Sequence, residues 1–449
     1  MLKACQSARK TASKTRPAKG GVVKVLVLGA GIIGVTTAHD LAEAGHEVTL
    51  IERREGAALE TSRANGGQLS ACEVAPWAGP EVPGLVLKWL GRADAPFKLS
   101  LKLDPDQWRF LWRFLLRCRT SARLERIGPN LELALATRQR MSEIEAACAA
   151  EGHPISYDRK SAGILRLFHH AAEWREAASL IERMAQGGVA QSLLDPAQCV
   201  ACEPALASAF QRGEIIGGIF SPDDGSGDAA LFTQALVQRA QRLGVTFLSG
   251  VTVVGFEKQA DRVHGVITSH GLHTADAVVI AAGVGSAALA RKLGFYLPVY
   301  PLKGYSVTVP LEATAEAMPH VSITDEARKV VISRLGNRLR AAGKAEIAGY
   351  DLTLDPARAR SVFQAVESLM PQIGPQAARA DYWCGLRPMS PDGSPIIGAA
   401  PGLSNLYFNT GHGSLGWTLG AGSAMALTDL ISAKTPQSES SPFHLSRFL

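Results

Sequence analysis

The stretch that decides the fold of this chain is Val22–Glu52, VVKVLVLGAGIIGVTTAHDLAEAGHEVTLIE. It opens with Val22–Leu28, a short run of mainly β-branched and aliphatic residues that is typical of a buried parallel strand. A helical pattern follows and ends at Gly45, because glycine readily takes the positive φ that closes helices. Val48–Ile51 forms a second apolar run, and Glu52 stands directly after it. This order predicts a strand–helix–strand unit with parallel strands.

The turn between the first strand and the helix has the sequence GAGIIG, residues 29–34. Gly29 permits a tight turn, Gly31 lets the backbone approach a pyrophosphate, and Gly34 lets helix and strand pack closely. The helix start offers unpaired N–H groups to phosphates. Glu52, 18 residues beyond Gly34, can accept hydrogen bonds from both ribose hydroxyls, and its charge argues against a 2′-phosphate. We therefore predict a dinucleotide site, in preference to a merely structural turn.

The composition describes an ordinary globular chain of 449 residues, with 46% hydrophobic and 20% charged residues. This length predicts two domains. The net charge of +6 comes from residues 1–20, which hold six basic residues and no acid, while the remainder has 41 basic and 41 acidic residues. A neutral body gives no reason to expect nucleic acid as a partner.

The basic N-terminal segment has no apolar core and therefore does not read as a secretory signal, which leaves a disordered leader or an organellar transit peptide. No run of eighteen apolar residues predicts a membrane span. The seven scattered cysteines indicate reduced thiols. Cys199 and Cys202 have metal-site spacing, but no second pair completes a set, so we expect a capped helix and no metal.

Residues 107–118, QWRFLWRFLLRC, predict a short helix with two different sides. Arginines recur every four residues along one side, and Trp and Leu occupy the other. The two sets are Arg109, Arg113 and Arg117, and Trp108, Leu111, Trp112 and Leu115. One interpretation is a helix packed on the core with solvated arginines. The other is an interfacial helix that binds anionic lipid, for which the segment is short.

The remaining periodicity predicts helices over residues 130–150, 171–186, 229–243 and 356–370, with Asp228 as an N-cap. Strands are expected over residues 245–248, 251–256, 263–268, 277–282, 305–309, 329–333 and 338–342. A second glycine turn follows at Gly283, but no acid stands near twenty residues beyond it. We interpret it as another strand of the same domain, so a flavin-to-NAD(P)H shuttle within this chain is not expected.

Several motifs together resemble the FAD-dependent family that contains D-amino-acid oxidase and glycine oxidase. They are ALETSRANGGQLS, APWAGPEVPG, VYPLKGYSVTV, WCGLRPMSPDGSPIIG and NTGHGSLGWT. Within that family their order is similar to the small subunit of bacterial D-amino-acid dehydrogenases. The resemblance covers residues 22–436. It departs at residues 63–67, where relatives carry smaller residues, and in the basic extension before Val22.

The resemblance implies an α/β fold, with a Rossmann-like FAD-binding domain and an interleaved α+β substrate domain on an antiparallel sheet. The expected FAD domain comprises residues 22–90, 225–292 and 384–434. The substrate domain comprises 91–224 and 293–383, between a basic tail, 1–21, and a C-terminal tail, 435–449.

The family's non-covalent FAD implies a set of cofactor-binding positions around the first turn, a following loop and the last helix. Here they are Leu28, Gly29, Ala30, Gly31, Ile32, Ile33, Gly34, Glu52, Arg53, Ser62, Gln68, Leu69, Val253, Gly283, Gly411, His412, Gly413, Ser414, Leu415 and Gly416. The last six would present a helix start to the flavin, where negative charge develops on reduction. We expect a mainly structural role for His412.

Arg387 is the position that matches the family's clamp for the substrate carboxylate, since a guanidinium offers two parallel donors. Tyr305 is a weaker candidate for the same carboxylate, and an ordinary strand tyrosine is the alternative. The implied reaction is hydride transfer from the Cα of a D-amino acid to the flavin. It gives an imino acid that water hydrolyses to a 2-oxo acid and ammonia.

The resemblance implies a quinone or other respiratory acceptor, and a cytoplasmic protein that binds the inner face of the membrane peripherally. Alternatives in the same class are glycine/sarcosine-type oxidases and D-proline or D-hydroxyproline dehydrogenases. An alternative in a different class is a non-catalytic nucleotide-binding scaffold. The sequence does not specify the preferred D-amino acid.

Overall fold

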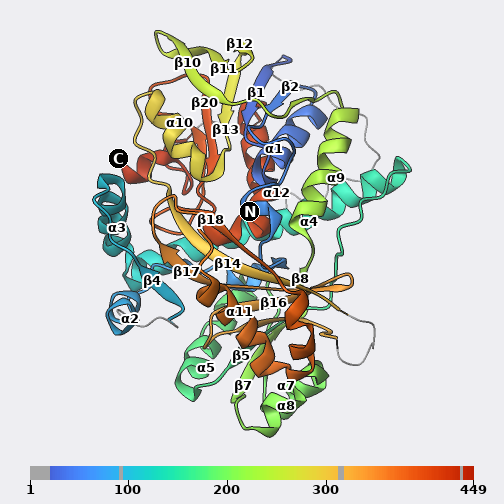
Figure 1. Cartoon of the computed structure of the whole chain (residues 1–449). Helices are drawn as coiled ribbons and strands as arrows, with labels where there is room; N and C mark the ends of the chain where they lie inside the picture. The colour runs from blue at the N-terminus through green and yellow to red at the C-terminus, as the bar shows by residue number, and fades with distance from the viewer. Residues whose placement is uncertain (1–20, 90–94, 312–317, 435–437) are drawn as a thin grey trace.

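The computed structural model describes residues 21–89, 95–311, 318–434 and 438–449. The expected basic tail lies almost wholly outside these residues. The chain forms a nucleotide-binding part, drawn at the top of Figure 1, and a second part below it that is built on a large sheet. The sheet of the nucleotide-binding part takes strands from the start, middle and end of the chain, and the large sheet takes its strands from the two stretches between them, so the two parts are interleaved along the sequence.

The nucleotide-binding part contains a six-stranded sheet in the order β19-β20-β13-β1-β2-β9. Its strands are β1 (Lys24–Leu28), β2 (Glu47–Ile51), β9 (Thr246–Leu248), β13 (Ala277–Ile280), β19 (Ile396–Ala399) and β20 (Leu406–Thr410). All neighbouring pairs are parallel except β19 with β20. The βαβ unit is therefore confirmed, and the strand before Gly283 belongs to the same sheet, as predicted.

Both faces of this sheet are covered, which explains why its strands are continuously apolar. Val25 and Val27 face one core, which the helices α1 (Ile32–Glu43), α4 (Thr120–Ala150), α9 (Ala229–Arg242) and α12 (Gly416–Ile431) share. Leu26 and Leu28 face the other core, under α10 (Ser286–Lys292) and a small antiparallel sheet. That sheet comprises β10 (Val253–Gln259), β11 (Arg262–Thr268) and β12 (Gly271–Thr274).

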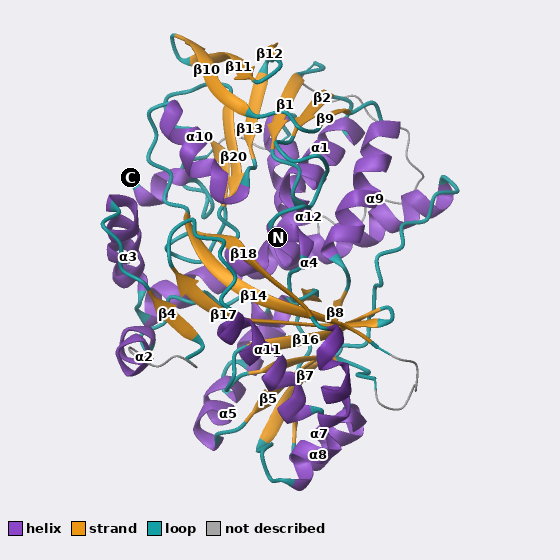
Figure 2. Ribbon diagram, viewed as in Figure 1, coloured by secondary structure: helices purple, strands orange, loops and turns teal. Residues whose placement is uncertain are grey.

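The second part contains a nine-stranded, mostly antiparallel sheet in the order β18-β14-β17-β16-β15-β5-β7-β6, with β4 paired to β17. Its strands are β4 (Phe97–Leu99), β5 (Ile164–Phe168), β6 (Ser192–Leu194), β7 (Gly217–Ser221), β14 (Tyr300–Pro310), β15 (Ser322–Asp325), β16 (Val330–Leu335), β17 (Arg338–Ile347) and β18 (Asp381–Met389). The helix α11 (Pro356–Leu369) packs on its lower face in Figure 2. A two-stranded sheet, β3 (Gln68–Leu69) with β8 (Gly225–Ser226), lies between the two parts.

The shorter helices surround this second sheet. They are α2 (Val82–Trp89), α3 (Pro105–Arg117), α5 (Ala171–Ala178), α6 (Ile181–Gln186), α7 (Pro196–Cys202) and α8 (Ala207–Gln211). The predicted helix 171–186 is thus two helices, and the predicted helix 130–150 begins ten residues earlier and includes Pro129. The capped helix before Cys202 is confirmed, because Asp195 and Gln198 form a capping box there.

Three of the expected domain boundaries differ from the structure. The boundary at residue 384 falls inside β18, which belongs wholly to the nine-stranded sheet. The helix α4 was expected in the substrate domain, but it packs against α12 in the nucleotide-binding core. The expected C-terminal tail is also packed, since Leu445 and Phe448 are buried and Arg447 pairs with Asp392 at 2.8 Å.

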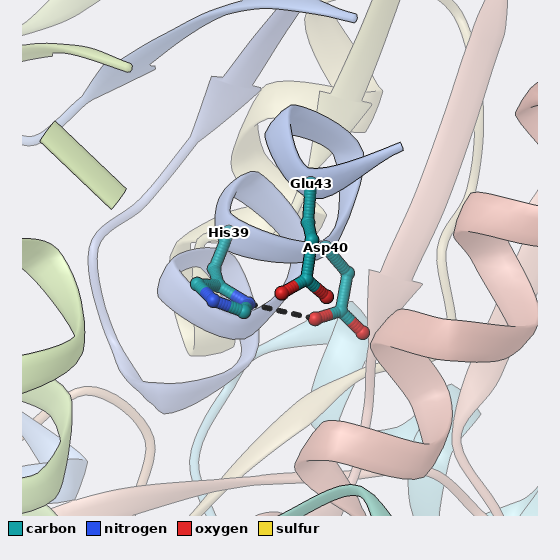
Figure 3. A group of neighbouring side chains, drawn as sticks. All are labelled: His39, Asp40 and Glu43. Atoms are coloured by element: carbon teal, nitrogen blue, oxygen red, sulfur yellow. Dashed lines mark hydrogen bonds and ion pairs between the residues drawn. The ribbon is translucent and has the colours of Figure 1, made fainter. Parts of the chain in front are cut away.

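A buried polar group joins three helices of the nucleotide-binding part. His39, Asp40 and Glu43 lie together on α1 (Figure 3), close enough in principle to hold a metal ion. Arg140 of α4 instead binds Asp40 at 2.9 Å and also pairs with Glu43, and Arg239 of α9 binds Glu43 at 3.0 Å. Because two guanidinium groups neutralise these carboxylates, the group ties α1 to α4 and α9.

No helix among the described residues combines the length and the apolar character that crossing a membrane requires. The six described cysteines are unpaired thiols, including Cys199 and Cys202. Burial raises the pKa of both thiols, which opposes formation of the thiolate that metals and redox chemistry use.

Candidate functional site

A cavity of about 1150 Å³ lies between the two parts of the molecule. Its walls come from the glycine turn after β1, the loop from Ala58 to Trp77, the cavity face of β14, β17 and β18, and the start of α12. The cavity continues between α2 and α3, where its lining becomes largely apolar. One end is thus a nucleotide-type site and the other opens between two short helices.

The glycine turn has the geometry that its sequence predicts. Gly29 has a φ of +108°, and a Cβ there would lie 2.7 Å from the carbonyl oxygen of Ala281. A Cβ on Gly34 would lie 1.7 Å from the carbonyl oxygen of Gly29, so only glycine allows this helix to approach the turn. Gly31 is the N-cap of α1, and the Ile32 N–H donates to Oγ of Ser62 at 3.1 Å. Ser62 therefore joins the loop to the helix start.

Glu52 lies at the end of β2 and lines the cavity. One carboxylate oxygen accepts from the Ala30 N–H at 2.7 Å, and the other accepts from the Arg54 N–H at 2.8 Å. These two bonds fix the carboxylate beside the turn. Arg53 also lines the cavity, and its guanidinium pairs with Glu60.

Two further predicted positions line the cavity from other strands. Val253, at the start of β10, lines the cavity as predicted. Gly283 follows β13 with a φ of +54°, and a Cβ there would meet nothing within 4 Å. The chain thus leaves open space at the place where a ribose would pack.

The start of α12 closes the other side of the cavity. A turn of 3-10 helix, Gly413–Leu415, precedes the helix, and residues 412–416 all line the cavity. His412 is buried, its Nε2 lies 2.9 Å from Oγ of Ser423, and burial lowers its pKa to about 3. His412 is therefore neutral at this turn, and whether it is structural or also contacts the flavin stays a prediction.

Three predicted cofactor residues do not line the cavity: Gly34, which packs against the glycine turn, Leu69 and Gly411. Leu69 packs against the core of the nucleotide-binding part. Gly411 has a φ of +78° and lies against Val299, Ser390 and Ile396. Leu69 and Gly411 belong to segments that line the cavity, and their assignment as cofactor-binding residues stays a prediction.

Arg387 lies on the cavity face of β18. Its Nη1 donates to the carbonyl oxygen of Lys344 at 3.1 Å, and its guanidinium lies 5.7 Å from the ring centre of Trp77. Among the described residues no carboxylate forms an ion pair with it. Burial lowers the pKa of Arg387 to about 10, so it remains charged at neutral pH. This is a positioned cation that has room for an anionic partner.

Tyr305 borders the cavity, but its side chain is directed into the core. Its ring is buried with Val307 in the core under α11, and its hydroxyl donates to Glu346 at 2.9 Å. Because side chains alternate along a strand, Tyr305 faces away from the side on which Gly304 contacts Arg387. This orientation favours the ordinary strand tyrosine over a carboxylate ligand, and the role of Tyr305 at the substrate stays a prediction.

Gln68 lines the cavity and donates to Ser322 and Thr324 across the gap to β15. Beyond it lies a charged group that the sequence analysis did not identify, namely Glu73, Arg166 and Glu326. Arg166 pairs with Glu326 and lies 3.7 Å from Glu73. Burial raises the pKa of Glu73, whereas the charge of Arg166 helps to hold that of Glu326 at about 2. Nothing in their local sequence brings these residues together.

Trp77 and Trp383 are further cavity residues that sequence reasoning missed. The sequence could have indicated Trp383, because every second residue of a strand lies on the same face. Residues 383, 385 and 387 therefore share the face of Arg387 on β18. No comparable pattern marks Trp77, which lies in an irregular loop.

The residues present fit an adenine dinucleotide with a flavin. Glycines 29, 31 and 34 bring a helix start to the phosphates, Glu52 is held at the ribose position, and Gly283 leaves space beside it. A second helix start, at α12, faces the same cavity. The fold and this site define a flavin-dependent oxidoreductase.

Comparison with known proteins agrees with this class. The family model "DAO: FAD dependent oxidoreductase" matches residues 24–430. The chain is 46% identical over 413 residues to the D-amino acid dehydrogenase of Paramagnetospirillum magneticum, covering 92% of this chain and 96% of that relative. The chain therefore belongs to the DAO family of FAD-dependent oxidoreductases, and its cofactor is FAD.

Solved structures share the fold. Glycine oxidase from Bacillus cereus matches with a TM-score of 0.71 at 24% identity, over 92% of this chain and 96% of its own. An L-α-glycerophosphate oxidase from Mycoplasma pneumoniae, solved with FAD bound, matches with a TM-score of 0.65 at 17% identity, over 95% and 98%. These similarities support the two-part architecture and not a particular substrate.

Proposed function

We propose that this protein is a D-amino-acid dehydrogenase, which oxidises D-amino acids to 2-oxo acids and ammonia. The observation that carries the proposal is Arg387, a cavity-facing guanidinium with no carboxylate partner among the described residues. A guanidinium of this kind matches the carboxylate that every amino acid carries. The activity named for the relative that is 46% identical supplies the D configuration.

The residues of this chain bind and orient the reactants. Glu52 and the helix start after Gly31 hold the adenosine diphosphate half of FAD, and the start of α12 holds the flavin end. Arg387 fixes the substrate carboxylate, while the carbonyl oxygen of Lys344 fixes Arg387. Bound FAD supplies the two-electron acceptor for the hydride of the substrate Cα. No catalytic base is assigned, because a substrate that binds as the neutral amine needs none.

The electron acceptor in this proposal is a quinone dissolved in a membrane. The cavity lining between α2 and α3 is apolar and includes Leu85, Val86, Leu111, Phe114 and Leu115. Such a lining suits an apolar acceptor better than a hydrophilic one. It would let the acceptor approach from the side on which these helices lie (Figure 1).

The proposed membrane contact uses α3, but with the opposite face from the one that the arginine row suggested. Arg113 and Arg117 donate to the carbonyl oxygens of Phe448 and Arg447, so this row packs against the C-terminal segment. The exposed side is apolar instead. On α3 it comprises Trp108, Trp112, Leu115 and Leu116, and Leu87 of α2 and Leu101 and Leu103 before α3 are exposed as well. We call these seven residues the apolar face.

Exposed cations flank the apolar face, namely Lys88, Lys102, Arg109 and Arg119. Two acids lie within this region. Asp104 accepts a hydrogen bond from Tyr300, and Asp106 forms ion pairs with Arg109 and Arg291. An apolar surface with surrounding cations is complementary to a bilayer that contains anionic lipid. We therefore propose that the protein docks there peripherally.

The test of the function is turnover with a panel of D- and L-amino acids, run with an artificial dye and separately with oxygen. We expect dye reduction with D-amino acids and ammonia release, and little hydrogen peroxide under air. Peroxide formation at the rate of dye reduction would instead indicate a glycine- or sarcosine-type oxidase. Turnover restricted to D-proline or D-hydroxyproline would narrow the substrate class. Absence of turnover and of bound FAD would favour a non-catalytic scaffold.

A further inference from the structure

Two glycines pair directly across neighbouring strands in the floor of the cavity. Gly304 of β14 stands opposite Gly385 of β18. Neither glycine has a left-handed φ, so backbone conformation does not require glycine at either position. Their lack of side chains must therefore be explained by what lies above them.

Gly304 lies beneath the side chain of Arg387, and Gly385 lies beneath that of Trp383. A Cβ on Gly304 would lie 2.5 Å from Nη2 and 2.6 Å from Cζ of Arg387. A Cβ on Gly385 would lie 2.0 Å from the Cη2 atom of Trp383. The guanidinium thus lies flat over one glycine, and the outer ring of the indole lies flat over the other.

Both side chains occupy the cavity side of the sheet. Residues 383, 385 and 387 alternate onto one face of β18, while Tyr382 and Cys384 pack into the core under α11. Trp383 and Arg387 both line the cavity. Because directly paired residues in an antiparallel sheet lie about 5 Å apart, the indole and the guanidinium are immediate neighbours on this floor.

We infer that Trp383 determines substrate specificity, by forming the wall against which the side chain of the amino acid packs. The inference rests on the proposed function, in which Arg387 binds the carboxylate. A carboxylate carbon is only one bond from Cα, so a group beside the guanidinium is within reach of the substituents on Cα. The indole limits the space available to a large side chain and offers an apolar surface to a small one.

Trp77 is a different kind of neighbour. The centre of its ring lies 5.7 Å from Cζ of Arg387, so Trp77 contacts the guanidinium itself and not the sheet surface beside it. Loss of Trp77 should weaken carboxylate binding for all substrates alike. Loss of Trp383 should instead change the preference among side chains.

The paired glycines provide a matched experiment. Gly385→Ala places a methyl group under the indole and displaces it, whereas Gly304→Ala places one under the guanidinium. We would measure kcat/KM for D-alanine, D-valine and D-phenylalanine with the artificial dye, for the wild type, both glycine variants and Trp383→Ala. FAD content and thermal unfolding of each purified variant would report on folding.

For Trp383→Ala and Gly385→Ala we expect the ratio of kcat/KM for D-phenylalanine to that for D-alanine to rise at least tenfold. For Gly304→Ala we expect kcat/KM to fall by a similar factor for all three substrates. Equal losses for all three substrates in Trp383→Ala and Gly385→Ala would overturn the inference. A wild type without activity on any D-amino acid would overturn the proposed function itself, which is a different outcome.

A binding measurement without turnover gives a second readout. Acetate and benzoate are unreactive carboxylates, and their binding can be followed by the change in flavin absorbance. In Trp383→Ala, benzoate should bind more tightly relative to acetate than in the wild type. In Gly304→Ala both Kd values should rise together. An unchanged benzoate-to-acetate ratio in Trp383→Ala would contradict the assignment of Trp383 to the side-chain wall.

Discussion

Arg387 illustrates what a single residue contributes to this site. Its charge is held in place by one carbonyl oxygen, by the flat surface of Gly304 and by the ring of Trp77. None of these contacts neutralises it. A partly buried charge without a counter-ion favours binding of an anion in the cavity that it lines.

Arg387→Lys keeps the charge and loses the bidentate fork. Because a hydrogen bond to a charged group is worth about 1.5–3 kcal/mol, we expect KM for the D-amino acid to rise roughly 10- to 100-fold. FAD content should stay normal. Arg262→Lys is a suitable control, since Arg262 of β11 donates to the carbonyl oxygen of Asp276 and does not line the cavity. An unchanged KM would remove Arg387 from the substrate site.

Glu52→Gln should weaken FAD retention, because a neutral amide is a poorer acceptor for ribose hydroxyls than a carboxylate. We expect the Kd for FAD to rise about tenfold, measured by fluorescence during dilution, with normal KM in the FAD-loaded fraction. Glu47→Gln is the matched control on the same strand, where the side chain is exposed. Equal FAD occupancy in Glu52→Gln and the wild type would contradict the assignment.

At the scale of elements, the helix α3 shows how one amphipathic pattern supports two orientations. Its sequence separates arginines from Trp and Leu, but it does not say which side faces the protein. The structure uses Phe110, which stacks on Tyr300 at 5.5 Å, together with Arg113 to attach the helix. Trp112 remains 63% exposed as a result, which makes the apolar side the available surface.

The proposed docking predicts that Trp108→Ser with Trp112→Ser releases the protein from vesicles containing anionic lipid. Activity with a water-soluble dye should remain, while reduction of a quinone within those vesicles should fall at least severalfold. Val254→Ser with Leu272→Ser is the control, because these residues are similarly exposed on the small sheet. Charge reversal at Arg113 and Arg117 should disturb the packing of the C-terminal segment, because both side chains donate hydrogen bonds to it. A loss of vesicle binding in that variant would therefore not report on lipid contact alone. If the wild type shows no affinity for such vesicles at low salt, the apolar face does not bind lipid.

At the scale of the whole molecule, the cavity proposed to hold FAD lies where the two parts meet, so FAD binding should stabilise both. The purified protein should be yellow and should release intact FAD on denaturation. Removal of FAD should lower Tm, because ligand that binds only the folded state adds stability in proportion to RT ln(1 + [L]/Kd). Absorbance of the denatured supernatant checks this. Flavin that remains with the precipitated chain would indicate a covalent link.

The buried group on α1 makes a separate prediction about pH. Burial opposes ionisation of Asp40, but the hydrogen bond with His39 and the charge of Arg140 outweigh it and lower the pKa of Asp40 below 3.8. A lowered folded-state pKa means that this stabilisation is present above about pH 4 and is lost as the pH falls through the folded value.

Asp40→Asn should therefore destabilise the protein by about 3–5 kcal/mol near neutral pH, because it leaves Arg140 short of a buried partner. The difference from the wild type should shrink on acidification, as urea unfolding at several pH values would show. Asp429→Asn removes an exposed pair with Lys434 and should change the stability little. A constant difference down to pH 3 would contradict the role given to the Asp40 carboxylate.

Local sequence determined the nucleotide-binding half of this protein, because the chemistry of that half is contained within one continuous unit. Gly29, Gly31, Gly34 and Glu52 have roles that follow from turn geometry and strand direction, and the structure places them accordingly. The βαβ order needs no distant contact to be recognised. The Asp228 cap of α9 is local in the same sense.

Tertiary structure decided the substrate half, since its residues come from strands that meet only after folding. The face on which Tyr305 lies depends on which side of β14 meets α11, and residues on both faces of β14 are buried. Trp383 and Arg387 become neighbours over Gly304 and Gly385 only through the register of β14 with β18. The outer side of α3 was likewise fixed by the C-terminal segment, more than 300 residues away in sequence.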